Sequence, residues 1–211
     1  MKKVFENYSL DKLNEIEISE GSIEKIYESY IKEFPENERK DINHLKELMN
    51  RKNYKLIVAN HIIFKEIIGY AFVYEIEKYN VLWLDYIAIE EKFQNSGYGT
   101  LLFNKIKEII GINKIGMFME VEIPENELQQ RRERFYERLN AKKLDINYQL
   151  PTADGNFDMN LFYLSINNDN ILLGEIIKDS ILNVYRNIHS DINPKDLIER
   201  IEKEKFNDIY L

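Results

Sequence analysis

The segment Gln94-Asn95-Ser96-Gly97-Tyr98-Gly99 has the composition of a loop that binds a phosphate group. It follows an apolar run at residues 81–89, typical of a strand, and precedes an amphipathic run at residues 100–110, typical of a helix. The first turn of a helix presents backbone N–H groups without intrahelical partners, and its dipole favours an anion. Glycines let a phosphate approach the backbone closely. We therefore expect residues Gln94 to Gly99, with Thr100, to cradle a pyrophosphate.

The spacing of the glycines excludes two common phosphate loops. A mononucleotide loop needs Gly, four residues and then Gly-Lys-Ser/Thr, and no such run is present. A dinucleotide fingerprint needs a third glycine three residues after the second, and Leu102 occupies that position. The loop therefore belongs to another class of phosphate-binding site.

Gln94, Gly97 and Gly99 fit a third spacing, Gln/Arg-x-x-Gly-x-Gly/Ala. This spacing resembles the acetyl-coenzyme A signature of the GNAT superfamily of N-acetyltransferases. The run from Phe135 to Ala141 is similar to the superfamily's Phe-Tyr-x-x-x-Gly-Phe segment, with Asn140-Ala141 in place of Gly-Phe. Asparagine tolerates left-handed backbone as glycine does, which would preserve the helix exit. The resemblance spans residues 22–166 and implies acetyl-coenzyme A as co-substrate.

The resemblance also implies roles for individual residues. Tyr136 takes the position of the superfamily's general acid, which protonates the leaving thiolate of coenzyme A. The backbone of Ile87, Ala88 and Ile89 would pair with the pantetheine arm as an added strand does. The superfamily often has an asparagine seven residues before the tyrosine, and Gln129 stands there.

Three carboxylates are candidates for the general base that would accept a proton from the amine. Asp85 is the sole acid within the apolar run at residues 81–89, where an unpaired charge is costly. Glu120 and Glu122 alternate with apolar residues on the next predicted strand, so they share one face. The three could converge around an amine, or they could form salt bridges or face solvent.

Composition limits the remaining classes of function. The formal net charge of −8 argues against broad nucleic-acid binding, and it fits either cationic substrates or ordinary acidic solubility. The chain has no cysteine, which excludes thiolate catalysis and cysteine-zinc sites. Three scattered histidines argue against a histidine-based metal site, so we expect no metal and take each histidine as surface-exposed or hydrogen-bonded.

The chain has no apolar run long enough for a membrane span, and its first residues turn polar too soon for a signal peptide. We therefore expect a cytoplasmic protein with no membrane partner.

Hydrophobic periodicity predicts an α/β (α+β) fold in the order αα-βββ-α-β-α-β-β, with a mixed central sheet covered by helices on both faces. This is the order that the GNAT fold would give. Predicted helices cover residues 22–34, 38–51, 100–110, 127–139, 171–188 and 194–206. Predicted strands cover residues 54–64, 67–76, 81–89, 114–123, 142–148 and 159–166, with a loop at 151–156.

The polar run at residues 167–170 divides the chain into a GNAT domain, residues 1–166, and a C-terminal helical extension, residues 167–211. The two helices of the extension could pack on the sheet, close over the substrate site or form a homodimer. The helix at 127–139 carries Arg131, Arg132, Arg134 and Arg138, which could face solvent or contact the 3′-phosphate of coenzyme A.

The resemblance therefore implies an N-acyltransferase that moves an acetyl group from acetyl-coenzyme A to a primary amine of a small molecule or peptide. Both substrates would bind together and the amine would attack the thioester directly, and the absence of a cysteine that could form an acyl-enzyme fits this direct transfer. A transferase for longer acyl chains is a variant of this function. The alternative from another class is a non-catalytic sensor of acyl-coenzyme A, whose hallmark would be a lost tyrosine; Tyr136 is intact.

Overall fold

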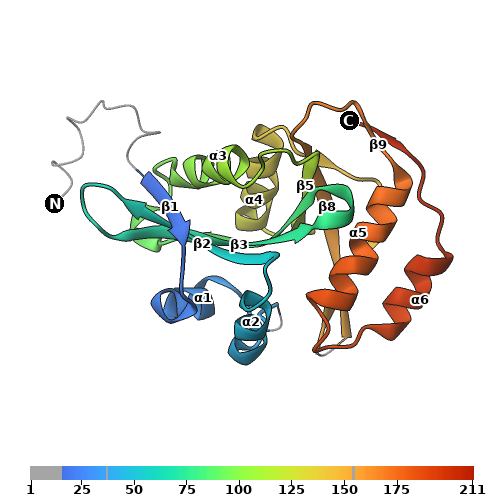
Figure 1. Cartoon of the computed structure of the whole chain (residues 1–211), viewed down its shortest axis with the longest axis horizontal. Coiled ribbons are helices and arrows are strands. Elements are labelled where there is room, and N and C mark those ends of the chain that lie inside the picture. Colours follow the sequence, from blue (N-terminus) through green and yellow to red (C-terminus); the bar gives the residue numbers. More distant parts are fainter. Residues whose placement is uncertain (1–15, 37, 154) are drawn as a thin grey trace.

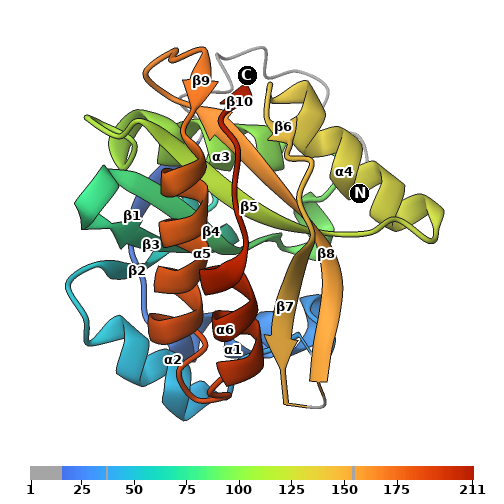
Figure 2. The ribbon, with the colours of Figure 1, turned by 90° about the vertical axis from the view of Figure 1, so that its right-hand side faces the viewer.

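The computed structural model describes residues 16–36, 38–153 and 155–211. It is built around an eight-stranded sheet with the order β1-β2-β3-β4-β5-β8-β6, in which β7 also pairs with β8 (Figures 1 and 2). The strands are β1 Ile16–Glu20, β2 Tyr54–His61, β3 Ile67–Ile76, β4 Val81–Ile89, β5 Gly116–Glu122, β6 Lys142–Lys143, β7 Tyr148–Thr152 and β8 Gly155–Ser165. Two short strands, β9 Ile171–Leu172 and β10 Ile209–Tyr210, form a separate antiparallel pair.

Helices cover both faces of the sheet. They are α1 Tyr27–Glu33, α2 Ile42–Met49, α3 Tyr98–Ile109, α4 Glu127–Arg138, α5 Gly174–Asn187 and α6 Lys195–Lys203. In Figure 1, α3 and α4 lie above the sheet, α1 and α2 lie below it, and α5 and α6 lie at its right-hand end. The α/β class with helices on both faces is therefore confirmed.

The central strands are buried on both faces, as their near-continuous apolar sequence predicts. One core layer, on the side of α3, includes Leu82 of β4 and Phe103 of α3, both fully buried. The other layer joins Trp83 of β4 to Leu45 of α2 and Ile177 of α5. The C-terminal helices therefore share a continuous hydrophobic core with α1, α2 and the sheet.

The central sheet opens between β4 and β5. These strands pair in parallel from Val81 and Gly116 up to Leu84 and Met119, and no further. At the same point β4 carries a bulge, because Leu84 pairs with Val73 of β3 and Tyr86 pairs with Phe72, which leaves Asp85 without a partner. Asp85 and Glu120 are thus the first residues beyond the last rung of the β4–β5 ladder.

The structure differs from the sequence expectation mainly at the chain segments around the sheet edge. The strand predicted at residues 142–148 is two strands, β6 and β7, and the predicted loop at 151–156 is instead the end of a β7–β8 hairpin. Pro151 suggested a loop, but β7 pairs only with β8, and an edge strand accepts proline. The helix predicted at 22–34 is a 3₁₀ turn, Ile23–Lys25, followed by α1.

Strand β1 and the β9–β10 pair were not expected, because short edge strands carry weak periodicity. Within the described ranges, no helix combines the length and the hydropathy that a bilayer crossing requires.

Candidate active site

A cleft of about 500 Å³ opens where β4 and β5 separate. It is bounded by β4, β5, the loop before α3, and α4. The sequence-predicted residues that line it are Asp85, Ile87, Ala88, Ile89, Gln94, Asn95, Gly97, Gly99, Thr100, Glu120, Glu122 and Tyr136. Ser96, Tyr98 and Gln129 do not line the cleft. The structure therefore brings both strand segments, the loop and the tyrosine to one site.

The phosphate-binding loop is held in a conformation that suits glycine and asparagine. Gly97 is the N-cap of α3 with φ = +89°, and Asn95 has φ = +62°. Both angles lie in the left-handed region, where most side chains are strained. The Gln94 side chain donates to the carbonyl of Ile89 at 2.9 Å, which ties the loop to the end of β4.

A positive charge from α4 lies beside the loop. The Arg131 guanidinium donates a hydrogen bond to the Asn95 side chain, and Arg131, Arg132 and Arg138 all line the cleft. Arg134 does not line it. The arginines of this helix thus divide into a group at the cleft and one residue away from it.

Gln129 stands away from the expected cofactor contact. Its side-chain oxygen accepts a hydrogen bond from the backbone N–H of Glu125 at 2.8 Å, and its own backbone N–H donates to the Asn126 side chain at 3.0 Å. The glutamine and the asparagine therefore stabilise the start of α4. The sequence pointed to Gln129 only because it stands seven residues before the tyrosine, and such a spacing does not distinguish a helix cap from a ligand contact.

Tyr136 lies near the end of α4, where Asn140 has φ = +65°. This left-handed residue after the helix confirms that asparagine takes the place of the expected glycine and keeps the backbone conformation with which the chain leaves the helix. Burial raises the pKa of the Tyr136 phenol, and the charge of Arg132 opposes this rise. The phenol is therefore protonated at neutral pH.

Asp85 is engaged in a buried network. Lys40 donates from Nζ to one carboxylate oxygen at 2.8 Å, and Tyr54 donates to the other at 2.5 Å. The Lys40 and Asp85 side chains are only 4% and 1% exposed. Burial opposes the charge on Lys40, but the anionic field of Asp85 prevails and raises the lysine pKa. Lys40 was not predicted, since a lysine beside a helix start is usually exposed.

Glu120 has different electrostatic surroundings from those of Asp85. Burial and then the negative charge of Asp85 raise the pKa of its carboxyl to about 7, while Lys40 and a hydrogen bond from Tyr148 act in the opposite direction. A carboxyl with this pKa exists in both protonation states at neutral pH, as a general base requires. The contact of Tyr148 with Glu120 was not predicted either, because residues 142–148 were assigned to one continuous strand.

Glu122 forms an ion pair with Arg132 of α4. The pair links β5 to α4 on one wall of the cleft. Of the three carboxylates predicted as a base, Asp85 and Glu122 are thus engaged by cations, and Glu120 is held by a neutral phenol.

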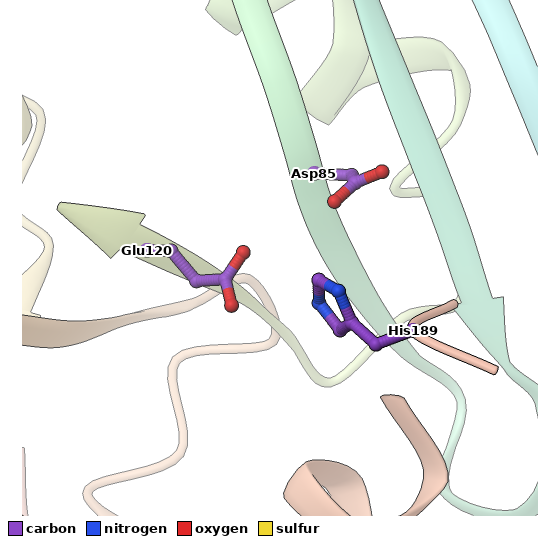
Figure 3. Close-up of side chains that lie close together, drawn as sticks. All are labelled: Asp85, Glu120 and His189. Carbon is purple, nitrogen blue, oxygen red and sulfur yellow. The ribbon is translucent and has the colours of Figure 1, made fainter. Parts of the chain in front are cut away.

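His189, just after α5, adds a third polar group to the buried network (Figure 3). Ligating atoms of Asp85, Glu120 and His189 lie within 4.8 Å of one another. Both oxygens of Asp85 already accept hydrogen bonds, and the Lys40 ammonium opposes a further cation. The donor set therefore suits hydrogen bonding better than a metal ion. The expectation for His189 was wrong: it is buried, and its Nε2 atom has no hydrogen-bond partner.

A second cavity of about 560 Å³ adjoins the first and shares Glu38, Lys40 and Leu150 with it. Acidic residues in its lining are Glu36, Glu38, Asp41 and Asp191, and basic ones are Arg39 and Lys40. His189 also lines this cavity. Lys40 thus lines both cavities, while Asp85 and Glu120 line the first.

The site thus combines a mixed sheet that separates between β4 and β5 with a glycine-bearing loop at the start of α3. The model of the acetyltransferase (GNAT) family matches residues 23–141, more than half of the chain. The protein therefore belongs to the GNAT family and is an N-acetyltransferase.

Solved structures of the same fold agree with this assignment. A protein from Bacteroides thetaiotaomicron assigned to the GNAT family of acetyltransferases superposes with a TM-score of 0.66 at 18% identity, over 85% of this chain and 99% of that one. Spermidine N-acetyltransferase from Vibrio cholerae, in complex with coenzyme A and spermine, has a TM-score of 0.56 at 14% identity, over 72% and 96% of the two chains.

The ribosomal-protein-S18-alanine N-acetyltransferase from Escherichia coli has a TM-score of 0.54 at 19% identity, over 72% and 94% of the chains. At these identities the likeness concerns the fold. A search of curated protein sequences found no match.

Proposed function

We propose that this enzyme transfers an acetyl group from acetyl-coenzyme A to a primary amine within a ternary complex. The observation that carries the proposal is the pairing, in one cleft, of Glu120, whose pKa is raised to about 7, with the protonated phenol of Tyr136. Direct acyl transfer needs one group to accept a proton from nitrogen and one to donate a proton to sulfur.

The donor would bind along the loop and β4. The first-turn amides of α3 would hold the pyrophosphate, with Arg131 close to the loop as a further cation. The pantetheine arm would extend along the backbone of Ile87, Ala88 and Ile89, which line the cleft beyond the last β4–β5 pair. Backbone N–H groups of this segment would polarise the thioester carbonyl.

Glu120 would act as the general base. Most amines are protonated at neutral pH, so a proton must leave nitrogen before its lone pair can attack the thioester carbon. Asp85 is held by Lys40 and Tyr54, and Glu122 by Arg132, so removing a proton with either would cost an ion pair. The Glu120 carboxylate accepts a hydrogen bond from the phenol of Tyr148, and it forms no ion pair among the residues that the structure describes.

Tyr136 would act as the general acid. Collapse of the tetrahedral intermediate breaks the carbon–sulfur bond and leaves a thiolate, which takes the phenolic proton. The positive charge of Arg132 would stabilise the phenolate that forms, since it opposes the rise in the tyrosine pKa that burial causes.

The acceptor would enter from the second cavity. Its lining carries more carboxylates than basic side chains, and one of the basic ones, Lys40, is neutralised by Asp85. This charge balance favours a cationic amine. The spermine complex of the Vibrio cholerae relative provides a probe of this class.

Tyr136→Phe tests the proposal. With acetyl-coenzyme A and a panel of primary amines that includes spermine and an alanine-terminated peptide, turnover should fall about 10- to 100-fold while acetyl-coenzyme A still binds. Tyr163→Phe is the matched control, because Tyr163 is buried but does not line the cleft. Equal turnover in the two variants would contradict the role of Tyr136. Coenzyme A binding by the wild type without turnover of any amine would favour the sensor function.

A further inference from the structure

His189 is the one buried histidine with an unpartnered ring nitrogen in the part of the chain that the structure describes. It is 2% exposed, and Figure 3 shows its ring directed into the space between Asp85 and Glu120. A buried nitrogen without a partner costs about 1–3 kcal/mol, so such a group in a native protein requires an explanation. The other two histidines lack this feature, because His44 contacts the Ile188 carbonyl and His61 accepts from backbone N–H groups.

The spacing of the cluster fits one shared water molecule. One ring nitrogen of His189 and one carboxylate oxygen each of Asp85 and Glu120 lie within 4.8 Å of one another. Two hydrogen bonds of about 2.8 Å to a single oxygen, at a tetrahedral angle, place the outer atoms about 4.6 Å apart. A polar site with two or more partners is where an internal water is stable.

We propose that His189 is a positioning residue for the general base, joined to Glu120 by one bridging water molecule. The water donates one hydrogen to the Glu120 carboxylate and the other to Nε2 of His189. This arrangement orients the carboxylate and stabilises its charged form. The proposal rests on Glu120 being the base, and it makes the segment after residue 166 part of the active site.

The surroundings keep the imidazole uncharged. Burial, and then the charges of Lys40 and His44, hold the pKa of His189 well below its usual range. A neutral ring offers Nε2 as an acceptor when the proton is on Nδ1. The titratable or charged groups that influence His189 or Glu120 from neighbouring elements are Lys40, His44, Asp85, Tyr148 and Tyr185, with Asp191 in the loop after α5.

Carbon-13 NMR of the Glu120 carboxyl against pH tests the inference in the free protein. His189→Phe removes the acceptor and should raise the Glu120 pKa by about one unit, because the water loses its second partner. His189→Gln keeps a polar group at the end of the side chain and should retain at least about half of the effect. His61→Phe is the control, since His61 is equally buried but lies outside the cluster.

An unchanged Glu120 pKa in His189→Phe, or an equal shift in His61→Phe, would overturn the inference. If His189→Phe does not fold, nitrogen-15 NMR of the wild-type histidines provides the test. Glu120→Gln should then shift the Nε2 resonance of His189 and leave that of His61 unchanged, and no shift at His189 would refute the coupling. Neither readout uses turnover, so failure here is distinct from failure of the proposed acetyl transfer.

Discussion

Three carboxylates at the cleft have different electrostatic surroundings, and these surroundings assign their roles. Asp85 has a lysine and a tyrosine, Glu122 has an arginine, and Glu120 has a tyrosine beside a negative neighbour. In the last case, burial and the negative neighbour raise the pKa of the Glu120 carboxyl to about 7. The sequence predicted all three as candidates but could not choose among them, because Lys40, Tyr54 and Tyr148 are distant in the chain.

Glu120→Gln should lower turnover about 100-fold, since an amide cannot accept the proton of the amine. The wild-type rate should rise with pH through about 7, because the base works only when it is deprotonated. The Glu120→Gln variant should lack this rise of the rate with pH. Glu133→Gln is the control, as Glu133 does not line the cleft. If the rate of Glu120→Gln still rises with pH through about 7, the general base must be another residue.

Lys40→Met should destabilise the protein by about 3–5 kcal/mol, because it leaves the carboxylate of Asp85 buried without its cation. Lys40→Met combined with Asp85→Asn should recover part of this loss. Lys32→Met is the surface control, since the Lys32–Glu91 pair is exposed and should contribute nothing measurable. Chemical denaturation measures all three. Equal stabilities for Lys40→Met and Lys32→Met would contradict a buried ion pair.

At the scale of elements, the β4 bulge and the separation from β5 create the site. Sequence predicted the strands at 67–76 and 81–89 with the observed bounds, since long apolar runs identify buried strands. It did not predict the bulge at Asp85, because register depends on pairing with Phe72 and Val73 of β3. The phosphate loop was predictable from local chemistry, and Gly97 at φ = +89° agrees with it.

Helix α4 supplies cations to one side of this cleft. Arg131→Ala should weaken acetyl-coenzyme A binding several-fold, because it removes the cation that lies beside the proposed phosphate-binding loop. Arg134→Ala should bind as the wild type does, since Arg134 is exposed away from the cleft. Calorimetry with acetyl-coenzyme A and with its 3′-dephospho form would show which phosphate is contacted. Equal losses in both variants would mean that α4 acts only through its net charge.

At the scale of the molecule, the segment after residue 166 is integrated with the sheet. Tyr185 of α5 donates to the Gln149 carbonyl at 2.5 Å, and Arg200 of α6 donates to the Gln149 side chain at 2.5 Å. The amphipathic sequence predicted these helices but left open packing, closure or dimerisation. Packing against β7 could not be foreseen, because β7 itself was not recognised as a separate strand.

At neutral and higher pH, the carboxyl of Glu120 should lower the free energy of unfolding of the whole molecule. The folded-state pKa of Glu120, about 7, exceeds its ordinary value of 4.5. The carboxyl therefore destabilises the fold increasingly as pH rises from about 4.5 to 7, and fully above that range. Glu120→Gln should raise the free energy of unfolding by about 1–3 kcal/mol at pH 8 and change it little at pH 4.5. Equal effects at both pH values would contradict the raised pKa.

Calorimetric titration of the wild-type protein with acetyl-coenzyme A, with NAD and ATP as controls, tests the central claim most directly. The loop, the separated strands and the arginine of α4 predict one site with micromolar affinity that is selective for acetyl-coenzyme A. An absence of binding, or equal binding of NAD and ATP, would contradict the assignment of the cleft to the acetyl donor.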